Sequence, residues 1–123
     1  MANGNKVVQW SNTGSLDQLW YADYANSDEF RIRNKYTDSV GNKYCLDVPN
    51  ASTQVGMKVQ IWTCNTNRQQ LWSWSFDGPT GYGHLINDGT SLYIAVNGGD
   101  PVVGRDVIQW SWRDTLDQYW GAA

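Results

Sequence analysis

The chain has 123 residues and a formal net charge of −3, and charged residues make up only 17% of it. This length fits one ordinary domain. Eight tryptophans, seven tyrosines and two phenylalanines argue against intrinsic disorder, because disordered chains are poor in aromatic residues. The scattered basic residues offer no positive face for nucleic acid, and no apolar run approaches the roughly 18 residues of a membrane span.

The rare titratable residues also limit the chemistry. His84 is the single histidine, so a histidine-based triad or a histidine-rich metal site has only this residue to use. No nucleophile elbow, phosphate loop or zinc motif occurs, and we therefore expect no catalysis, no cofactor and no metal. We expect His84 to be a strand residue with a hydrogen-bonded ring nitrogen. Cys45 and Cys64 fit one disulfide, although two reduced core thiols satisfy the same count.

Short strands are predicted all along the chain. Runs such as 30–33 and 59–63 alternate apolar and polar residues, with β-branched and aromatic side chains, which is typical of half-buried strands. Loops rich in Gly, Asn, Asp and Ser separate them, including one at 78–81. In chain order the predicted strand-bearing runs are 4–10, 30–34, 44–48, 56–63, 83–87, 93–96 and 104–110.

The sequence repeats with a period near 50 residues. A Gln-x-Trp motif occurs three times, and each glutamine follows a glycine by 14 residues. These pairs are Gly4 with Gln18, Gly56 with Gln70, and Gly104 with Gln118. Units are predicted at approximately 1–22, 23–76 and 77–123 of a single domain, with the front half of the first unit missing. A truncated sequence, strands supplied by a second chain, or an incomplete barrel would each explain the missing half.

These motifs resemble the ricin-B-type lectin domain over nearly the whole chain. The resemblance rests on the three Gln-x-Trp motifs and on Tyr44-Cys45-Leu46-Asp47-Val48 followed by Val59-Gln60-Ile61-Trp62-Thr63-Cys64. It implies an all-β fold, the β-trefoil, with three units around a pseudo-threefold axis. We expect the motif tryptophans Trp20, Trp72 and Trp120 to pack in the core, and their glutamines to bond backbone groups of the loops.

The resemblance also implies a sugar site in the second unit. Asp47 matches the family's acceptor of sugar hydroxyls, and Trp62 matches the ring on which the sugar stacks. Gln60 matches a supporting polar residue, while Gln69 stands where the family has asparagine. The third unit has Ala95 in place of the aspartate. In the family, cysteines placed like Cys45 and Cys64 form a disulfide, which indicates a secreted protein whose leader is absent from this chain.

The resemblance therefore predicts a non-catalytic module that binds galactose-type or related glycans through one shallow pocket. Such a module gains strength from repeated sites or from a tethered enzyme or toxin domain. The alternative is a protein-interaction or protease-inhibitor trefoil, with the insertion at 36–43 as its contact.

Overall fold

The computed structural model describes residues 2–37, 39–77 and 82–121, and within these ranges it is built from strands and short turns. The predicted loop at 78–81 lies outside the described residues. One sheet has the strand order β4-β3-β2-β5-β6-β7-β8, and β1 also pairs with β2. The strands are β1 Trp20–Tyr24, β2 Glu29–Thr37, β3 Lys43–Asp47, β4 Gln60–Thr63, β5 Trp72–Asp77, β6 Tyr82–Asn87, β7 Tyr93–Val96 and β8 Val107–Trp110.

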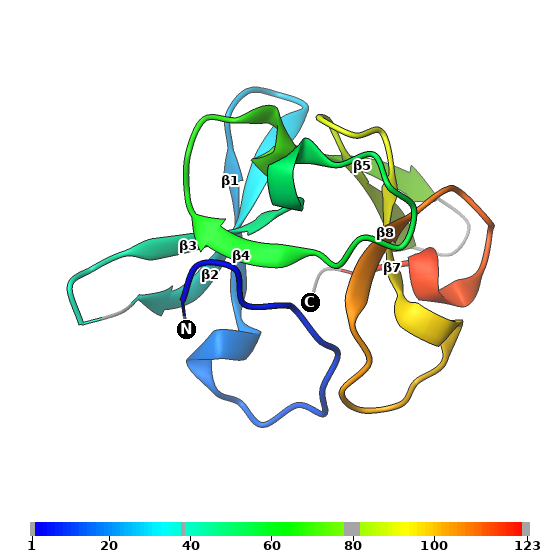
Figure 1. Ribbon diagram of the computed structural model, residues 1–123, viewed down its shortest axis with the longest axis horizontal. Helices are drawn as coiled ribbons and strands as arrows, with labels where there is room; N and C mark the ends of the chain where they lie inside the picture. Colours follow the sequence, from blue (N-terminus) through cyan, green and yellow to red (C-terminus); the bar gives the residue numbers. More distant parts are fainter. Residues whose placement is uncertain (1, 38, 78–81, 122–123) are drawn as a thin grey trace.

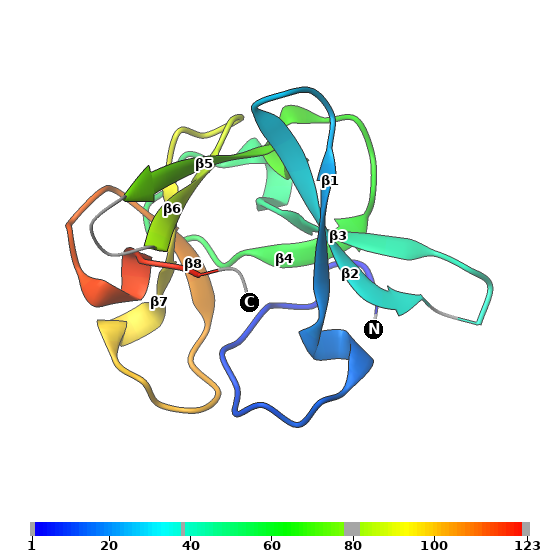
Figure 2. The same cartoon turned by 180° about the vertical axis from the view of Figure 1, so that it is seen from behind.

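Neighbouring strands in the sheet run antiparallel. Figure 2 shows two hairpins from behind, one formed by β1 and β2 and the other by β5 and β6. The hairpin of β2 and β3, which contains the insertion at 36–43, projects away from the rest of the molecule (Figure 1).

A ring of backbone hydrogen bonds joins the three units. The Val7 N–H donates to the Val59 carbonyl at 3.2 Å, Val59 donates to Val107 at 3.0 Å, and Val107 donates back to Val7 at 2.8 Å. These valines occupy equivalent positions, three residues after the repeated glycines. The N-terminal segment therefore lies beside β4 (Figure 1), and the ring closes although the first unit lacks its front half.

The repeated glycines precede this ring in one shared conformation. Gly4, Gly56 and Gly104 have φ values of 88°, 90° and 89°. This left-handed region is strained for any residue with a Cβ, so the turn before each ring strand requires glycine. Two residues after these glycines, the Lys6 and Lys58 ammonium groups lie 3.1 and 3.4 Å from the Asp106 carboxylate and hold the pKa of that carboxyl below its ordinary value.

The buried core comes mainly from the second unit, from residues on or next to β2, β3, β4 and β5, and β7 and β8 each add one side chain. Its buried apolar members are Phe30, Tyr44, Leu46, Val48, Val59, Ile61, Trp72, Ile94 and Val107.

Candidate functional site

The Gln-x-Trp glutamines hold the polar loops in place. Each side-chain oxygen accepts from the backbone N–H five residues earlier, and each side-chain amide donates to the carbonyl seven residues earlier, at distances of 2.7–3.1 Å. The sets are Gln18 with Thr13 and Ser11, Gln70 with Asn65 and Thr63, and Gln118 with Arg113 and Ser111. The predicted role of these glutamines is confirmed.

The motif tryptophans differ in burial, and the prediction that all three lie in the core is wrong for Trp20. Trp72 is fully buried and Trp120 is half-buried, whereas Trp20 is 37% exposed. The Trp72 indole N–H donates to the Leu46 carbonyl at 3.3 Å, and Trp120 donates in the same way to Ile94. Both partners belong to front-half strands. Within the described residues, no strand of the first unit lies over Trp20 in the corresponding way.

Asp47 lies at the end of β3 and is held by two side-chain amides. Gln60 donates to one carboxylate oxygen at 2.9 Å and Gln70 donates to the other at 3.0 Å. Asp47 as a whole residue is 3% exposed. Burial raises the pKa of Asp47, and the two amide hydrogen bonds act in the opposite direction. Each oxygen keeps further acceptor capacity, so the pair of amides fixes the orientation of the group.

Sequence reasoning missed the contact between Gln70 and Asp47. It assigned Gln70 to the loop backbone alone, as for the other two motif glutamines. A signal for the additional role was present, since the second unit alone combines a motif glutamine with an aspartate in the preceding Leu-Asp-Val run.

The other two predicted site residues lie nearby on different elements. Trp62 is two residues after Gln60 on β4, so the two side chains leave the same face of the strand, and the ring is 42% exposed. Gln69 is half-buried in the turn Arg68–Gln70, and its carbonyl accepts from the backbone N–H of Val48, the residue after Asp47. The structure thus brings Asp47 and Gln60 into direct contact and places Trp62 and Gln69 on the flanking segments.

The equivalent places in the other units are built differently. In the third unit Ala95 pairs with Ile108, so apolar residues stand at the positions of Asp47 and Gln60, and the Arg113 guanidinium lies over the Trp110 ring. The carboxylate nearest to this place, Asp117, accepts from the backbone N–H of Val96 at 3.2 Å. In the first unit, Trp10 is 58% exposed and faces no counterpart of β3 in the described part of the chain. Among the described residues, a strand aspartate held by two side-chain amides near an exposed tryptophan is therefore found in the second unit.

The disulfide expected in this unit is present. Cys45 on β3 is bonded to Cys64, just after β4, so the covalent bridge joins the two strands that carry Asp47 and Trp62. His84 is also as predicted: it lies on β6, and its Nδ1 is 2.9 Å from the Gln118 carbonyl. Within 2–37, 39–77 and 82–121, no three His, Cys, Asp or Glu side chains gather as a metal-binding group, and no helix is long and apolar enough to span a bilayer.

Comparison with known proteins identifies the family. The ricin-type β-trefoil lectin domain matches residues 1–120. The chain belongs to this family. A designed threefold-symmetric protein, ThreeFoil, has a TM-score of 0.87 at 26% identity, with 98% of this chain and 81% of that chain covered. The all-β, β-trefoil prediction is thereby confirmed.

Two other similar structures are larger proteins. An exo-β-1,3-galactanase from Clostridium thermocellum has a TM-score of 0.83 at 28% identity, and the match covers 94% of this lectin domain and 24% of that chain. A mosquitocidal holotoxin has a TM-score of 0.82 at 18% identity, with 98% and 14% covered. The lectin domain thus matches only a small part of each of these two chains.

Proposed function

We propose that this lectin domain is a non-catalytic module that binds galactose-type glycans through its second unit. Asp47 accepts sugar hydroxyls, Trp62 stacks on the apolar face of the ring, and Gln60 and Gln69 supply further polar contacts. The observation that carries the proposal is the Asp47 carboxylate, which two amides orient beside an exposed tryptophan. A carboxylate is a strong acceptor, so fixing its direction favours one arrangement of hydroxyls.

The low exposure of Asp47 is what we expect of a residue on the floor of the proposed sugar pocket rather than on its rim. A hydroxyl that reaches the carboxylate exchanges water for a charge-assisted hydrogen bond in a partly desolvated place, while the ring of Trp62 remains open to contact the sugar face. Galactose-type sugars are chosen because the galactanase is 28% identical over 94% of this chain.

A single shallow site binds weakly, because it buries little of the ligand. We therefore propose that the domain acts while attached to, or associated with, a larger enzyme or toxin, as the coverage of the galactanase and holotoxin chains suggests. The disulfide supports an extracellular location, where such bonds persist.

The experiment is a calorimetric or NMR titration with galactose, lactose and a β-1,3-linked galactobiose. Trp62→Ala should weaken binding at least tenfold, and Trp110→Ala, the equivalent residue of the third unit, should leave it within about twofold. Trp62 is half-exposed, so its removal leaves the fold intact. Unchanged binding by Trp62→Ala, or an equal loss with Trp110→Ala, would place the site elsewhere.

A further inference from the structure

The sequence contains the dipeptide Asn-Gly twice, at 3–4 and at 97–98. In this dipeptide the asparagine side chain can lose ammonia, because the glycine that follows has no side chain to hinder attack by its own backbone nitrogen. Asparagine is accordingly among the thermolabile residues of proteins. Whether either asparagine reacts in the folded chain depends on how firmly its side chain and the next backbone N–H are held.

Both residues of the first dipeptide are held by β4. The Gly4 N–H donates to the Ile61 carbonyl at 2.9 Å. The Asn3 side-chain oxygen accepts from the backbone N–H and the hydroxyl of Thr63 at 2.7 and 3.1 Å. A backbone N–H that is already hydrogen-bonded must break that bond before its nitrogen can attack, and a fixed side chain cannot swing toward it. The folded structure therefore protects Asn3.

The second dipeptide lies in the turn Asn97–Gly99, which follows β7 in the third unit (Figure 1), and it is exposed. Among the described residues, neither the Asn97 side chain nor the Gly98 N–H has a hydrogen-bond partner. The surroundings of Gly98 are open, since the position that a Cβ would take there is 3.8 Å from Asp100 and 3.9 Å from Arg105. The groups that would react are therefore unprotected at this second place.

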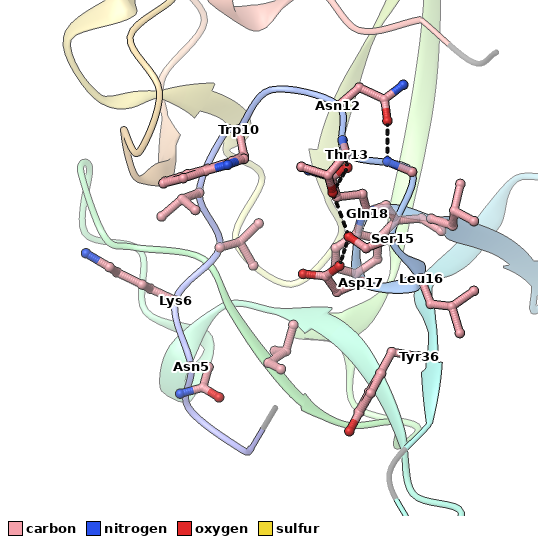
Figure 3. Close-up of a pocket in the computed structure, with 16 residues that line it drawn as sticks. Asn5, Lys6, Trp10, Asn12, Thr13, Ser15, Leu16, Asp17, Gln18 and Tyr36 are labelled. Carbon is pink, nitrogen blue, oxygen red and sulfur yellow. Dashed lines mark hydrogen bonds between the residues drawn. The ribbon is translucent and has the colours of Figure 1, made fainter.

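Loop asparagines in the other units are held by their own side chains. The side-chain oxygens of Asn12, Asn26 and Asn65 each accept from the backbone N–H two residues later at 2.9 Å. Figure 3 shows this bond at Asn12. Such a bond fixes the side chain over its own turn. The Asn97 side chain makes no such bond to Gly99 in the described structure.

The turn Asn97–Gly99 is also less tightly closed than its counterparts. In the four other short turns of this type in the described chain, at 16–18, 49–51, 68–70 and 116–118, the N–H after the turn donates to the carbonyl of its first residue at 3.0–3.1 Å. The turn Asn97–Gly99 lacks this bond. Gly98 and Gly99 both have positive φ values, of 81° and 68°. Two successive glycines allow the backbone to bring the Gly98 nitrogen to the Asn97 side chain.

We propose that Asn97 is a site of spontaneous deamidation in the folded protein. The Gly98 backbone nitrogen attacks Cγ of Asn97, so that a new C–N bond forms while the bond from Cγ to Nδ2 breaks. Ammonia leaves with the proton that the Gly98 nitrogen gave up. Water then opens the succinimide ring. Attack of water at Cγ gives aspartate, and attack at the main-chain carbonyl carbon gives isoaspartate, in which Cβ has become part of the backbone.

Both products change the electrostatics or the geometry of this turn. Each adds a carboxylate near Asp100 and Asp117, which lie 3.8 and 3.6 Å from the Cβ positions of Gly98 and Gly99. Isoaspartate also lengthens the main chain directly after the Asn97 N–H, which donates to the Asp106 carbonyl at 2.9 Å. The isoaspartate form should therefore unfold at a temperature a few degrees lower than the parent.

The experiment follows both asparagines in one sample. The 123-residue chain, with its disulfide intact, is kept folded in mildly alkaline buffer made with H₂¹⁸O. Peptide mapping by mass spectrometry then measures aspartate and isoaspartate at positions 3 and 97. We expect conversion to be at least tenfold faster at Asn97 than at Asn3, with isoaspartate as the larger product. After reduction and unfolding in urea, the two rates should agree within about twofold, because both dipeptides are then exposed.

Two variants serve as controls. Asn97→Gln, whose amide would have to form a larger and less favourable ring, should abolish the reaction at this position and leave the thermal midpoint unchanged. Asn97→Asp reproduces the aspartate product without lengthening the backbone. It should lower the midpoint less than isoaspartate does in the fraction purified from the aged sample.

The proposal is wrong if Asn3 reacts as fast as Asn97 in the folded chain. It is also wrong if Asn97 yields aspartate without isoaspartate, since direct hydrolysis of the side-chain amide would then explain the product. If Asn3 stays slow in urea, its protection does not come from the fold, and the structural contrast between the two dipeptides fails. None of these measurements involves a sugar, so their outcome is independent of the proposed function.

Discussion

Tyr93 and Trp112 pack with their ring centroids 5.3 Å apart at the two positions where the second unit has its disulfide. Counted from the repeated glycines, Tyr93 corresponds to Cys45 and Trp112 to Cys64. Both rings also contact His84. The third unit therefore joins its two strands by an aromatic cluster where the second unit uses a covalent bond.

This correspondence predicts that a disulfide can replace the aromatic contact in the third unit. Trp112→Ala should lower the free energy of unfolding by about 1–2 kcal/mol, since it removes ring contacts from a half-exposed residue. Combining Tyr93→Cys with Trp112→Cys should form a disulfide and recover that loss. Urea unfolding with and without reductant checks both. A double variant that stays reduced in air would show that the two positions are not geometrically equivalent.

The motif glutamines should differ in importance according to their burial. Gln118→Ala leaves the Arg113 N–H and the Ser111 carbonyl without their partner in a buried place, which costs about 1–3 kcal/mol. Gln18→Ala removes the same contacts in the more open first unit, where water replaces them, and should cost less than about 1 kcal/mol. Chemical unfolding of the two variants tests the difference, and equal losses would contradict it.

The carboxyl groups of Asp88 and Glu29 make the stability of the fold depend on pH, and the direction of each effect follows from its pKa shift. Burial, and then the hydrogen bond that the protonated Asp88 carboxyl donates to Glu29, raise the pKa of Asp88, while accepting this bond lowers the pKa of Glu29. The Asp88 contribution to stability is fully present below its ordinary pKa of 3.8 and is lost as the pH rises through the raised value. Glu29 acts with the opposite sign: its contribution is lost as the pH falls through its lowered value.

Asp88→Asn should therefore be more stable than the parent at about pH 7, and its stability should fall less between about pH 4 and pH 7. Asn keeps the acceptor for the Ser73 hydroxyl. Thermal midpoints across this range provide the measurement, with the exposed Asp28→Asn as control. A curve for Asp88→Asn that runs parallel to the parent's would refute the assignment.

A substitution at Gln69 tests the proposed sugar site by an expected gain of affinity rather than a loss. Gln69→Asn keeps the amide and moves it to the shorter arm of the asparagine that the family resemblance predicts, next to Val48. We expect galactoside affinity to rise up to about tenfold, the scale of one well-placed hydrogen bond. Titration of this variant beside Gln18→Ala, which lies far from the site in sequence, checks the effect. A loss of affinity would mean that the longer side chain suits this pocket.

The internal repeat of the sequence was the basis for most of the fold prediction. Three glycines and three glutamines at equal spacing led to three equivalent turns and three loop contacts, because each local contact depends on residues only a few positions apart. Trp20 could not be judged in this way. The burial of this tryptophan depends on a strand outside its own motif. The same three residues, Gln-Leu-Trp, therefore end in a buried Trp72 and an exposed Trp20.

The candidate site was predictable in composition but not in its internal contacts. The family resemblance assigned Asp47 and Gln60 to one site, and their side chains hydrogen-bond. The second amide on Asp47 comes from Gln70, 23 residues later in the chain. That contact depends on how the turn Arg68–Gln70 folds back over the end of β3, which alternation and motif spacing do not describe.

The circular order of donation among Val7, Val59 and Val107 has a consequence for unfolding. In a linear repeat array the end units have one neighbour each, so they fray first and can be deleted singly. Here each unit adjoins both others, and no unit is terminal in space although two are terminal in sequence. Deleting residues 2–10 would break two of the three junctions at once. We expect a single cooperative transition in which the ten N-terminal residues melt with β8 rather than ahead of it.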